Sequence, residues 1–519
     1  MIINFFKDFS NEFLFIIPEL YFLLGFFIII FFFSIIKINI YFKKISIIVS
    51  TFNYLVLYFL FNLFLLFVLD FIEFKNNLYI YNFFFKKTTF FVFGSLFLIL
   101  ILFIYILFLQ KYNNLNNLNN YSFEYTIIIL FAVLGFVILF IVNDFLLFYI
   151  TFEIASLSLY VLISFNVQSN IAINSGLKYY ILGAISSSII LLGISFLYGI
   201  TGLTNFNDII NLLYFINIDS LYGKILIISI IFIFIGLFFK LGLFPFHFWL
   251  PFIYSGVSFK TILFLFLIPK LSFIFIFINF YINIFFDLSI YINNFLILFC
   301  IISIFIGTFG AIMQNNIKKL LAFSSIVNLG YIILILTTVT NYSIIYAITY
   351  CIIYFINLFS FFFVILITKK ILGFQELNLV YISQLSNIFK INPAFAFIIS
   401  IIIFSIAGLP PFGGFYTKYF ILLDLINIKA YFVVLFILLL SVISTFYYIR
   451  IIKIIFFNKN LVLNKEYYFN FQNNTLLFNY KNKQHIFHCL TLILVLIILN
   501  ILLCFYPSIL YYILFNLFF

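Results

Sequence analysis

The segment "GLFFKLGLFPFHFWLP", from Gly236 to Pro251, places a lysine inside an apolar run and then interrupts that run. Lys240 has apolar neighbours on both sides. Pro245 follows about one helical turn later and lacks the backbone donor that a continuous helix needs. His247 and the only tryptophan of the chain, Trp249, come next. A lysine beside a broken apolar helix predicts a site that uses charge inside a mostly apolar protein.

The composition decides which solvent surrounds that site. Hydrophobic residues make up 67% of the 519 positions and charged residues 8%, and the mean hydropathy is +1.31. A soluble core cannot hide so much apolar surface, and apolar runs of about 20 residues recur along the chain. The alternation typical of membrane β-barrels is absent from the sequence. We therefore predict an all-α polytopic membrane protein.

About fourteen membrane spans are expected, two of them broken. They lie near residues 13–36, 45–70, 88–110, 122–141, 144–165, 171–200, 223–248, 256–283, 288–312, 318–340, 343–368, 392–426, 430–457 and 486–515. The first run is too long for a signal-peptide core and is predicted to be a true span. The predicted parts are N-terminal helices (1–121), two inverted five-helix repeats (122–283 and 284–457), and a polar loop with a final span (458–519).

The distribution of cations predicts the orientation. The net charge is +12, but the lysines lie mostly in loops after odd-numbered spans, so they indicate topology and not a nucleic-acid partner. Those loops should face the matrix or cytoplasm, and both termini the opposite compartment. The chain has 87 Phe and 37 Tyr, and Arg450 is its only arginine. This bias resembles that of an A+T-rich organellar gene and predicts a mitochondrial inner-membrane location.

Five ionisable residues fall inside predicted spans. They are Glu153, Lys178, Lys240, Lys270 and Lys418. Any one of them could snorkel to the membrane surface, Glu153 and Lys178 most easily because they lie nearer their helix ends. Together they would cost on the order of ten kcal/mol in lipid, so we expect them to face a hydrated interior and relay charge. A Glu153–Lys178 pair on adjacent helices could change the proton affinity of the next lysine.

A second break, Pro410–Gly414, lies just before Lys418, whereas the first break lies just after Lys240. Unwound backbone at membrane depth is tolerated where it meets protein or water, and paired breaks indicate inverted repeats around a transport path. Lys240 and Lys418 are 178 residues apart (418 − 240), about five spans, which matches the predicted repeats. Proline and glycine are also common in ordinary membrane helices, which explains one break more easily than two.

Apart from the five ionisable residues and the two breaks, the sequence offers few other candidate functional residues. His247 either caps the broken span or shuttles protons. His485 and His488 have no carboxylate beside them and are interpreted as surface residues. The four cysteines are scattered, and the sequence contains no phosphate-binding glycine loop and no haem-ligand pair. We therefore expect this chain to hold no redox cofactor or metal.

The opening segment resembles the K-x-x-x-x-P-F-H-x-W-x-P signature of the antiporter-like subunits of respiratory complex I and of the multisubunit cation/proton antiporters. "AIMQNNIKKLLAFSSIVNLGYIILIL" (311–336), "SIAGLPPFGGFYTKYFIL" (405–422) and "FYYIRIIKIIFF" (446–457) resemble the family's tenth, twelfth and thirteenth spans. Within the family, "IPELYFLL" (17–24), "FEIASLSLYVLI" (152–163) and a lysine at 418 resemble the subunit 2 branch of complex I.

The resemblance implies a role for each buried charge. Glu153 would modulate Lys178 on the uptake side, Lys240 would carry the proton in the first repeat, and Lys270 would be the central link along the membrane arm. Lys418 would be the carrier or exit residue of the second repeat. FMN, iron–sulfur clusters and ubiquinone would be held by other subunits of the complex, which would be this chain's partners together with lipids. One departure is "PFIYSGVSF" (251–259), which lacks the acidic residues usual in that turn.

Three alternatives differ in class. A cation/proton antiporter subunit would share the fold without redox coupling. A lipid-linked glycosyltransferase would need an acidic site in a sizeable loop, and the long polar stretch offers only Glu466. A purely structural subunit would leave the five buried charges unexplained.

Overall fold

The computed structural model describes residues 15–39, 45–73, 78–80, 83–116, 122–166, 169–215, 219–340, 342–371, 381–386, 388–457, 494–503 and 505–518. Nearly every described element is a helix, because a backbone in hydrocarbon must satisfy its polar groups within the segment. The predicted polytopic all-α class is confirmed. The polar stretch 458–485, His485 and His488 lie outside the described residues.

The elements divide between two compact units. Unit 1 comprises Met1–Leu241 and Gly256–Ile292, and unit 2 comprises Gly242–Ser255 and Asn293–Leu517. Unit 1 holds α2 (Ile17–Asn39), α3 (Ile45–Glu73), β1 (Leu78–Ile80), β2 (Phe85–Lys87), α4 (Thr89–Asn116), α5 (Ser122–Ile141), α6 (Phe145–Ser164), α7 (Asn170–Thr201), α8 (Phe206–Leu213), α9 (Leu221–Leu241), α11 (Phe259–Ile278) and the short turns η1 (Asn279–Ile284) and η2 (Phe286–Leu288).

Unit 2 holds most of α10 (Trp249–Gly256) and of α12 (Ser289–Ile312), followed by α13 (Ile317–Leu336), α14 (Ser343–Ile371), η3 (Ile382–Leu385), α15 (Ile388–Ile391), α16 (Pro393–Ala407), α17 (Gly413–Asn427), α18 (Tyr431–Phe457), a short helix Leu494–Leu503, and α21 (Pro507–Phe518). The division of the chain into two inverted five-helix repeats stays a prediction.

Twelve helices in the described part of the chain are long and apolar enough to cross a membrane. The other two predicted spans are interrupted. The twelfth is split into α16 and α17, and the last into the helix Leu494–Leu503 and α21. The seventh span ends at Leu241, where the next residue, Gly242, has a left-handed φ of +80°. Both predicted breaks are therefore present.

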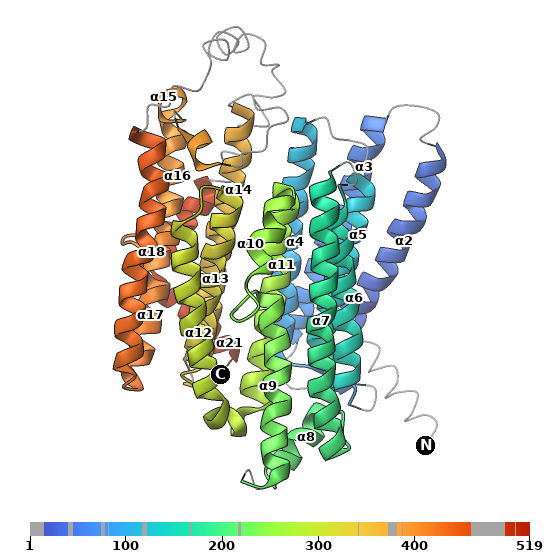
Figure 1. Ribbon diagram of the computed structural model, residues 1–519. Helices are drawn as coiled ribbons and strands as arrows, with labels where there is room; N and C mark the ends of the chain where they lie inside the picture. Colours follow the sequence, from blue (N-terminus) through green and yellow to red (C-terminus); the bar gives the residue numbers. More distant parts are fainter. Residues whose placement is uncertain are drawn as a thin grey trace. The chain divides into compact units, whose positions relative to one another are not determined.

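Within unit 1, α11 is the most deeply placed long helix. All of its spanning window is buried, and it packs against α4, α5, α6 and α9. Figure 1 shows that α5, α6 and α7 lie side by side along their length. A helix buried all round shows no amphipathic stripe, which is why its sequence is apolar on every face.

Small residues bring α7 and α9 into close contact. A Cβ on Gly193 would lie 2.7 Å from the carbonyl oxygen of Ser229, and one on Gly236 would lie 3.0 Å from that of Ser186. Since lipid tails are as apolar as leucine, membrane helices associate through such close packing. The glycines therefore fix the position of α9, which carries Lys240 in its last turn.

The β1–β2 hairpin was not expected from the sequence. It connects α3 to α4 and extends to the α5–α6 junction, where the backbone N–H of Asn143 donates to the carbonyl of Phe84 at 2.8 Å. The side chains of Asn143 and Asn205 both donate to the carbonyl of Phe83. The two strands of the hairpin are three residues long each. A period-two pattern of that length cannot be recognised in the sequence beside the long apolar runs.

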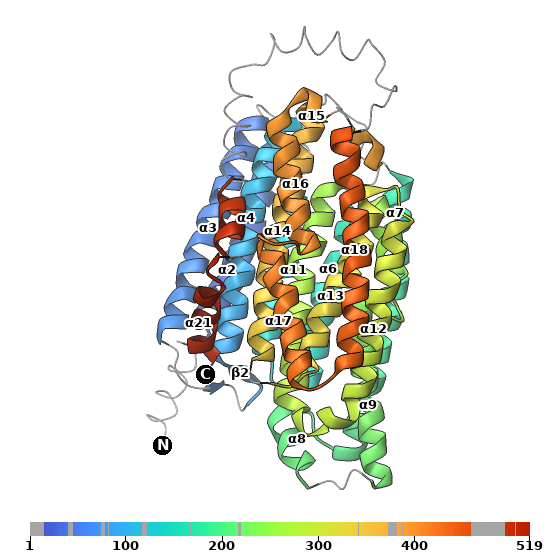
Figure 2. The same ribbon diagram turned by 90° about the vertical axis from the view of Figure 1, so that its left-hand side faces the viewer.

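Within unit 2, α16 lies above α17 with α18 running beside both (Figure 2). Helix α16 ends at Gly408, whose φ of +77° turns the chain out of the helix, and α17 begins five residues later at Gly413. The two halves approach so closely that a Cβ on Gly414 would lie 1.8 Å from the carbonyl oxygen of Ser405.

Replacing Gly414 with alanine should therefore destabilise unit 2 by about 1–3 kcal/mol, because the obstacle is backbone and cannot rotate away. The matched control is Gly199→Ala in α7, where nothing lies within 4 Å of the added Cβ and alanine is the better helix former. Thermal unfolding of the detergent-solubilised protein compares the two variants. Equal unfolding temperatures would contradict the close approach of the two half-helices.

Candidate functional site

Lys240 is buried, with 2% of its surface exposed, in the last turn of α9. Its ammonium donates a hydrogen bond of 2.8 Å to the hydroxyl of Tyr160 on α6. It also lies 4.8 Å from the ring centre of Phe152 and 5.2 Å from that of Tyr160. One hydroxyl and two aromatic faces thus replace part of the hydration that the ammonium loses.

Helix α6 extends this contact into a polar stripe. Glu153, Ser156 and Tyr160 are spaced by three and four residues, so they share one face of the helix. The Ser156 hydroxyl donates to Glu153 Oε2 at 3.0 Å. Glu153 and Tyr160 are seven residues apart, or about 10 Å along the axis. The α6 stripe therefore leads from a half-buried carboxylate to the buried ammonium of Lys240.

Residues of α7 hold Tyr160 in place. The rings of Tyr179 and Tyr180 meet the Tyr160 ring edge-on, with centroids 4.9 and 5.6 Å away. A Cβ on Gly183 would lie 2.1 Å from the Tyr160 hydroxyl oxygen, so only glycine leaves the space that this oxygen occupies. The orientation of Tyr160 toward Lys240 is thus determined by two helices at once.

Lys178 differs from the other predicted lysines because its side chain is exposed on α7. Helix α7 packs against α6, which carries Glu153, and the tyrosines that follow Lys178 in sequence contact Tyr160. The expected Glu153–Lys178 pair stays a prediction.

Lys270 and His247 are both buried, each with 2% exposed surface. The Lys270 ammonium lies 4.5 Å from the ring centre of Phe266, one turn earlier in α11. His247 lies in the break after α9 with its ring 3.9 Å from that of Phe248. Its Nδ1 has no hydrogen-bond partner among the described residues, so this atom caps no described helix.

Lys418 uses the second break directly. Its ammonium donates to the carbonyl of Ala407 at 2.6 Å, in the last turn of α16, and lies 5.9 Å from the ring centre of Tyr331. The last carbonyls of a helix lack intrahelical donors and carry partial negative charge, so they attract a cation. A Cβ on Gly408 would lie 2.8 Å from Lys418 Cδ, which leaves the side chain its route to that carbonyl.

Lys240, His247, Lys270, Lys418 and Glu153 all fall inside the segment that matches one protein family. Residues 142–444, more than half of the chain, match the family described as NADH:quinone oxidoreductase/Mrp antiporter, transmembrane. The chain belongs to this family. Membership in the antiporter-like family, predicted from the motifs, is thereby confirmed.

Related sequences are subunits of one enzyme. NADH-quinone oxidoreductase subunit N of Pelagibacter ubique is 38% identical over 336 residues, covering 65% of this chain and 69% of that protein. The subunit N of the Wolbachia of Brugia malayi is 36% identical over 337 residues, covering 64% of this chain and 70% of that protein.

Solved structures share the fold at low identity. A chain of respiratory complex I from Thermus thermophilus has a TM-score of 0.68 at 19% identity, covering 94% of this chain and 98% of that one. A chain of an archaeal membrane-bound sulfane sulfur reductase reaches 0.73 at 20%, covering 97% and 96%. A chain of the Mrp complex of a Dietzia species reaches 0.61 at 19%, covering 72% and 67%.

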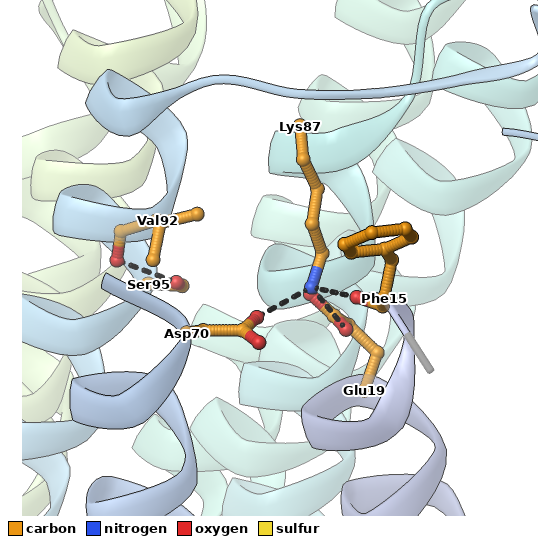
Figure 3. Close-up of polar contacts among 6 residues, drawn as sticks. All are labelled: Phe15, Glu19, Asp70, Lys87, Val92 and Ser95. Atoms are coloured by element: carbon orange, nitrogen blue, oxygen red, sulfur yellow. Dashed lines mark hydrogen bonds and ion pairs between the residues drawn. The ribbon is translucent and has the colours of Figure 1, made fainter. Parts of the chain in front are cut away.

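A second charged cluster lies outside the segment that defines the family, in the N-terminal part of unit 1. Lys87 of β2 is fully buried, and its ammonium lies 2.9 Å from Glu19 Oε2 of α2 and 2.7 Å from Asp70 Oδ2 of α3. It also donates to the carbonyl of Phe15 (Figure 3). This Lys87 cluster joins three elements through one ammonium, and its two carboxylates exceed its cations by one charge.

The sequence reasoning missed several of these residues. Tyr160 lies within the quoted α6 segment, and its i+7 spacing from Glu153 was the available signal. Glu19 and Asp70 are acidic residues at the ends of apolar runs, but only the hairpin brings Lys87 to them. Asp424, buried on the helix of Lys418, was also overlooked.

Replacing Lys87 with methionine should destabilise unit 1 by about 3–5 kcal/mol, because the buried carboxylate of Glu19 and the half-buried one of Asp70 lose their shared cation. Lys86→Met is the matched control, since the neighbouring Lys86 is only half-buried and its ammonium lies 5.3 Å from the Tyr79 ring centre. Thermal unfolding in detergent measures both variants. A Lys87 variant as stable as the Lys86 variant would show that the cluster does not hold the hairpin to α2 and α3.

Replacing Tyr160 with phenylalanine keeps the ring and removes the hydroxyl that accepts from Lys240. If that hydroxyl takes part in charge transfer, the transport rate should fall by about a hundredfold or more, which is the low end for the loss of one proton-transferring group. Tyr198→Phe, an exposed tyrosine on α7, should leave transport unchanged. Proton uptake into sealed vesicles reads out both variants, and equal rates would remove Tyr160 from the path.

Proposed function

We propose that this chain is a proton-translocating subunit of the membrane arm of a respiratory NADH:ubiquinone oxidoreductase. The two relatives described above are both subunit N of an NADH-quinone oxidoreductase. The observation that carries the proposal is the buried ammonium of Lys240, hydrogen-bonded to Tyr160 at the end of the α6 stripe. A desolvated amine with a defined hydroxyl partner is suited to taking up and releasing a proton.

The mechanism follows from the charges. Lys240 binds a proton as an ammonium and releases it as a neutral amine, and Tyr160 accepts or donates at 2.8 Å without moving. Glu153, at the far end of the stripe, favours the charged form of Lys240 when ionised and ceases to do so when it is neutral or pairs with another cation. A change at Glu153 therefore alters the proton affinity of Lys240.

Lys418 repeats this arrangement in unit 2 with a different partner. The Ala407 carbonyl is a fixed acceptor that cannot titrate, so release from Lys418 requires the ammonium to leave it. Lys270, a buried residue of α11, would be the central link along the membrane arm, as the family resemblance implies.

In this proposal, electron transfer takes place in other subunits of the complex. FMN, iron–sulfur clusters and ubiquinone would be held by other subunits, and quinone reduction there would drive proton transfer here through coupling along the membrane arm. The proposed location is the mitochondrial inner membrane, supported by the amino-acid bias toward Phe, Tyr and Lys. The proposed partners are the other membrane-arm subunits, including further antiporter-like chains.

A cation/proton antiporter subunit is the second candidate, because the same family includes the Mrp antiporters and an Mrp complex chain shares the fold. Native-gel separation of solubilised mitochondrial membranes discriminates between the two. NADH-dehydrogenase staining locates the oxidoreductase, and mass spectrometry detects peptides of this chain. Peptides in the stained band support the oxidoreductase, whereas peptides in a smaller assembly without NADH activity favour the antiporter.

Lys240→Ala in the assembled complex should abolish proton pumping by this subunit, because it removes the buried amine that binds and releases the proton beside Tyr160. Lys224→Ala is the matched control on the same helix, where the side chain is exposed near the first turn of α9. Pumping is measured in sealed vesicles with NADH and a quinone, beside electron transfer in uncoupled membranes. Pumping that survives in the Lys240 variant would favour a structural subunit.

A further inference from the structure

Asp424 is a buried carboxylate that none of the steps above uses. It lies in the last turn of α17, six residues after Lys418, with 2% of its surface exposed. Its Oδ2 accepts from the hydroxyls of Thr338 at 2.8 Å and Thr340 at 2.9 Å, both in the turn that follows α13. Among the described residues no cationic side chain lies within ion-pair distance, and the nearest lysine in sequence, Lys429, is exposed.

The turn that supplies the hydroxyls is held in a costly conformation. Val339, between the two threonines, has a φ of +51°. A β-branched residue in the left-handed region is an outlier that persists only where its surroundings impose it. Here the conformation directs both hydroxyls at the same carboxylate oxygen.

The Thr338 hydroxyl suits both protonation states of Asp424. Its oxygen lies 2.8 Å from Asp424 Oδ2 and also 2.8 Å from the carbonyl oxygen of Ile335. One hydroxyl hydrogen cannot serve both acceptors. When Asp424 is ionised, Thr338 donates to it. When Oδ2 carries a proton, that O–H donates to Thr338, whose own hydrogen turns to Ile335.

Asp144 shows what a structural aspartate looks like in the same chain. It is equally buried and its Oδ2 also accepts from a hydroxyl, that of Thr204 at 2.6 Å, but its Oδ1 accepts from the backbone N–H groups of Leu146 and Leu147 at the start of α6. A helix N-terminus stabilises the anion and satisfies donors that need a cap. Asp424 lies instead at a helix C-terminus, where the backbone disfavours negative charge and offers no donor.

From this arrangement we infer that Asp424 is the proton-accepting residue that follows Lys418 on the path out of unit 2. The inference rests on the proposed function. The predicted orientation places the end of α17 and the turn after α13 at the face opposite the matrix. The backbone of Lys418 lies about 9 Å earlier along the helix axis, so the two residues follow one another toward that face.

The transfer is balanced in two steps. An N–H bond of the Lys418 ammonium breaks and an O–H bond forms on Asp424, through intervening water, leaving a neutral amine and a carboxylic acid. The O–H bond of Asp424 then breaks and the proton passes to water of the outer compartment, which restores the carboxylate. Tyr346 of α14, another titratable group near Asp424, takes no part in either step.

The test is Asp424→Asn in the complete complex. Asparagine preserves the size and still accepts from both threonines, but it cannot take up a proton. The pumping rate in sealed vesicles should fall by about a hundredfold or more, which is the low end for the loss of one proton-transferring group. Asp208→Asn, an exposed aspartate on α8, is the matched control and should pump normally.

Asp424→Glu keeps a titratable carboxylate and should assemble and retain most of the pumping. If Asp424→Asn assembles and pumps normally, the carboxylate serves only to anchor α17, and the inference is wrong. Failure of Asp424→Asn to assemble would likewise assign the charge to folding and overturn it. Assembly is read on native gels before any rate is measured.

Lys418→Ala separates this inference from the proposal on which it rests. If that variant pumps normally, the proposed function of unit 2 fails whatever Asp424 does. If it loses pumping while Asp424→Asn retains it, only the role of Asp424 is removed.

Discussion

The need to satisfy every backbone polar group inside a hydrocarbon layer governs the whole structure. Because of it, nearly all described elements are helices. Each interruption is costly unless a side chain or another backbone group forms a hydrogen bond with the backbone groups that it frees. The break after α16 meets this need in a specific way, because a carbonyl freed at Ala407 receives the ammonium of Lys418. The unwound backbone and the buried charge each stabilise the other, so they occur at the same place.

The two lysines beside the breaks satisfy similar demands with chemically different partners. Lys240 precedes its break and meets a phenolic hydroxyl with two aromatic faces. Lys418 follows its break and meets a helix end. A phenol can exchange a proton with the amine, whereas a carbonyl can only accept a hydrogen bond from the ammonium. The difference suits Lys240 to passing a proton along a stripe, and it makes a separate acceptor beyond Lys418 necessary.

Much of this could be predicted from sequence because the relevant signals are local. Apolar runs of about 20 residues, prolines within them and isolated lysines can each be recognised without knowledge of the fold. The Lys87 cluster shows the limit. Lys86 and Lys87 look equivalent in sequence, but the hairpin buries one between two carboxylates and leaves the other half-buried over a tyrosine. The sequence likewise does not distinguish Lys178 from Lys240, although both lie in apolar helices and only Lys178 is exposed.

Carboxylates at helix ends make the same point about function. Asp144, Asp70 and Asp424 are the same residue type in an apolar chain, but they receive different donors. Asp144 accepts from backbone N–H groups and from the hydroxyl of Thr204. Asp70 accepts from an ammonium, and Asp424 accepts from two hydroxyls. Backbone N–H groups and an ammonium stabilise a permanent anion, whereas a hydroxyl can reverse its hydrogen bond when the carboxylate takes up a proton. Of these three carboxylates, only Asp424 is held by hydroxyls alone among the described side chains, which is the arrangement best suited to repeated proton transfer.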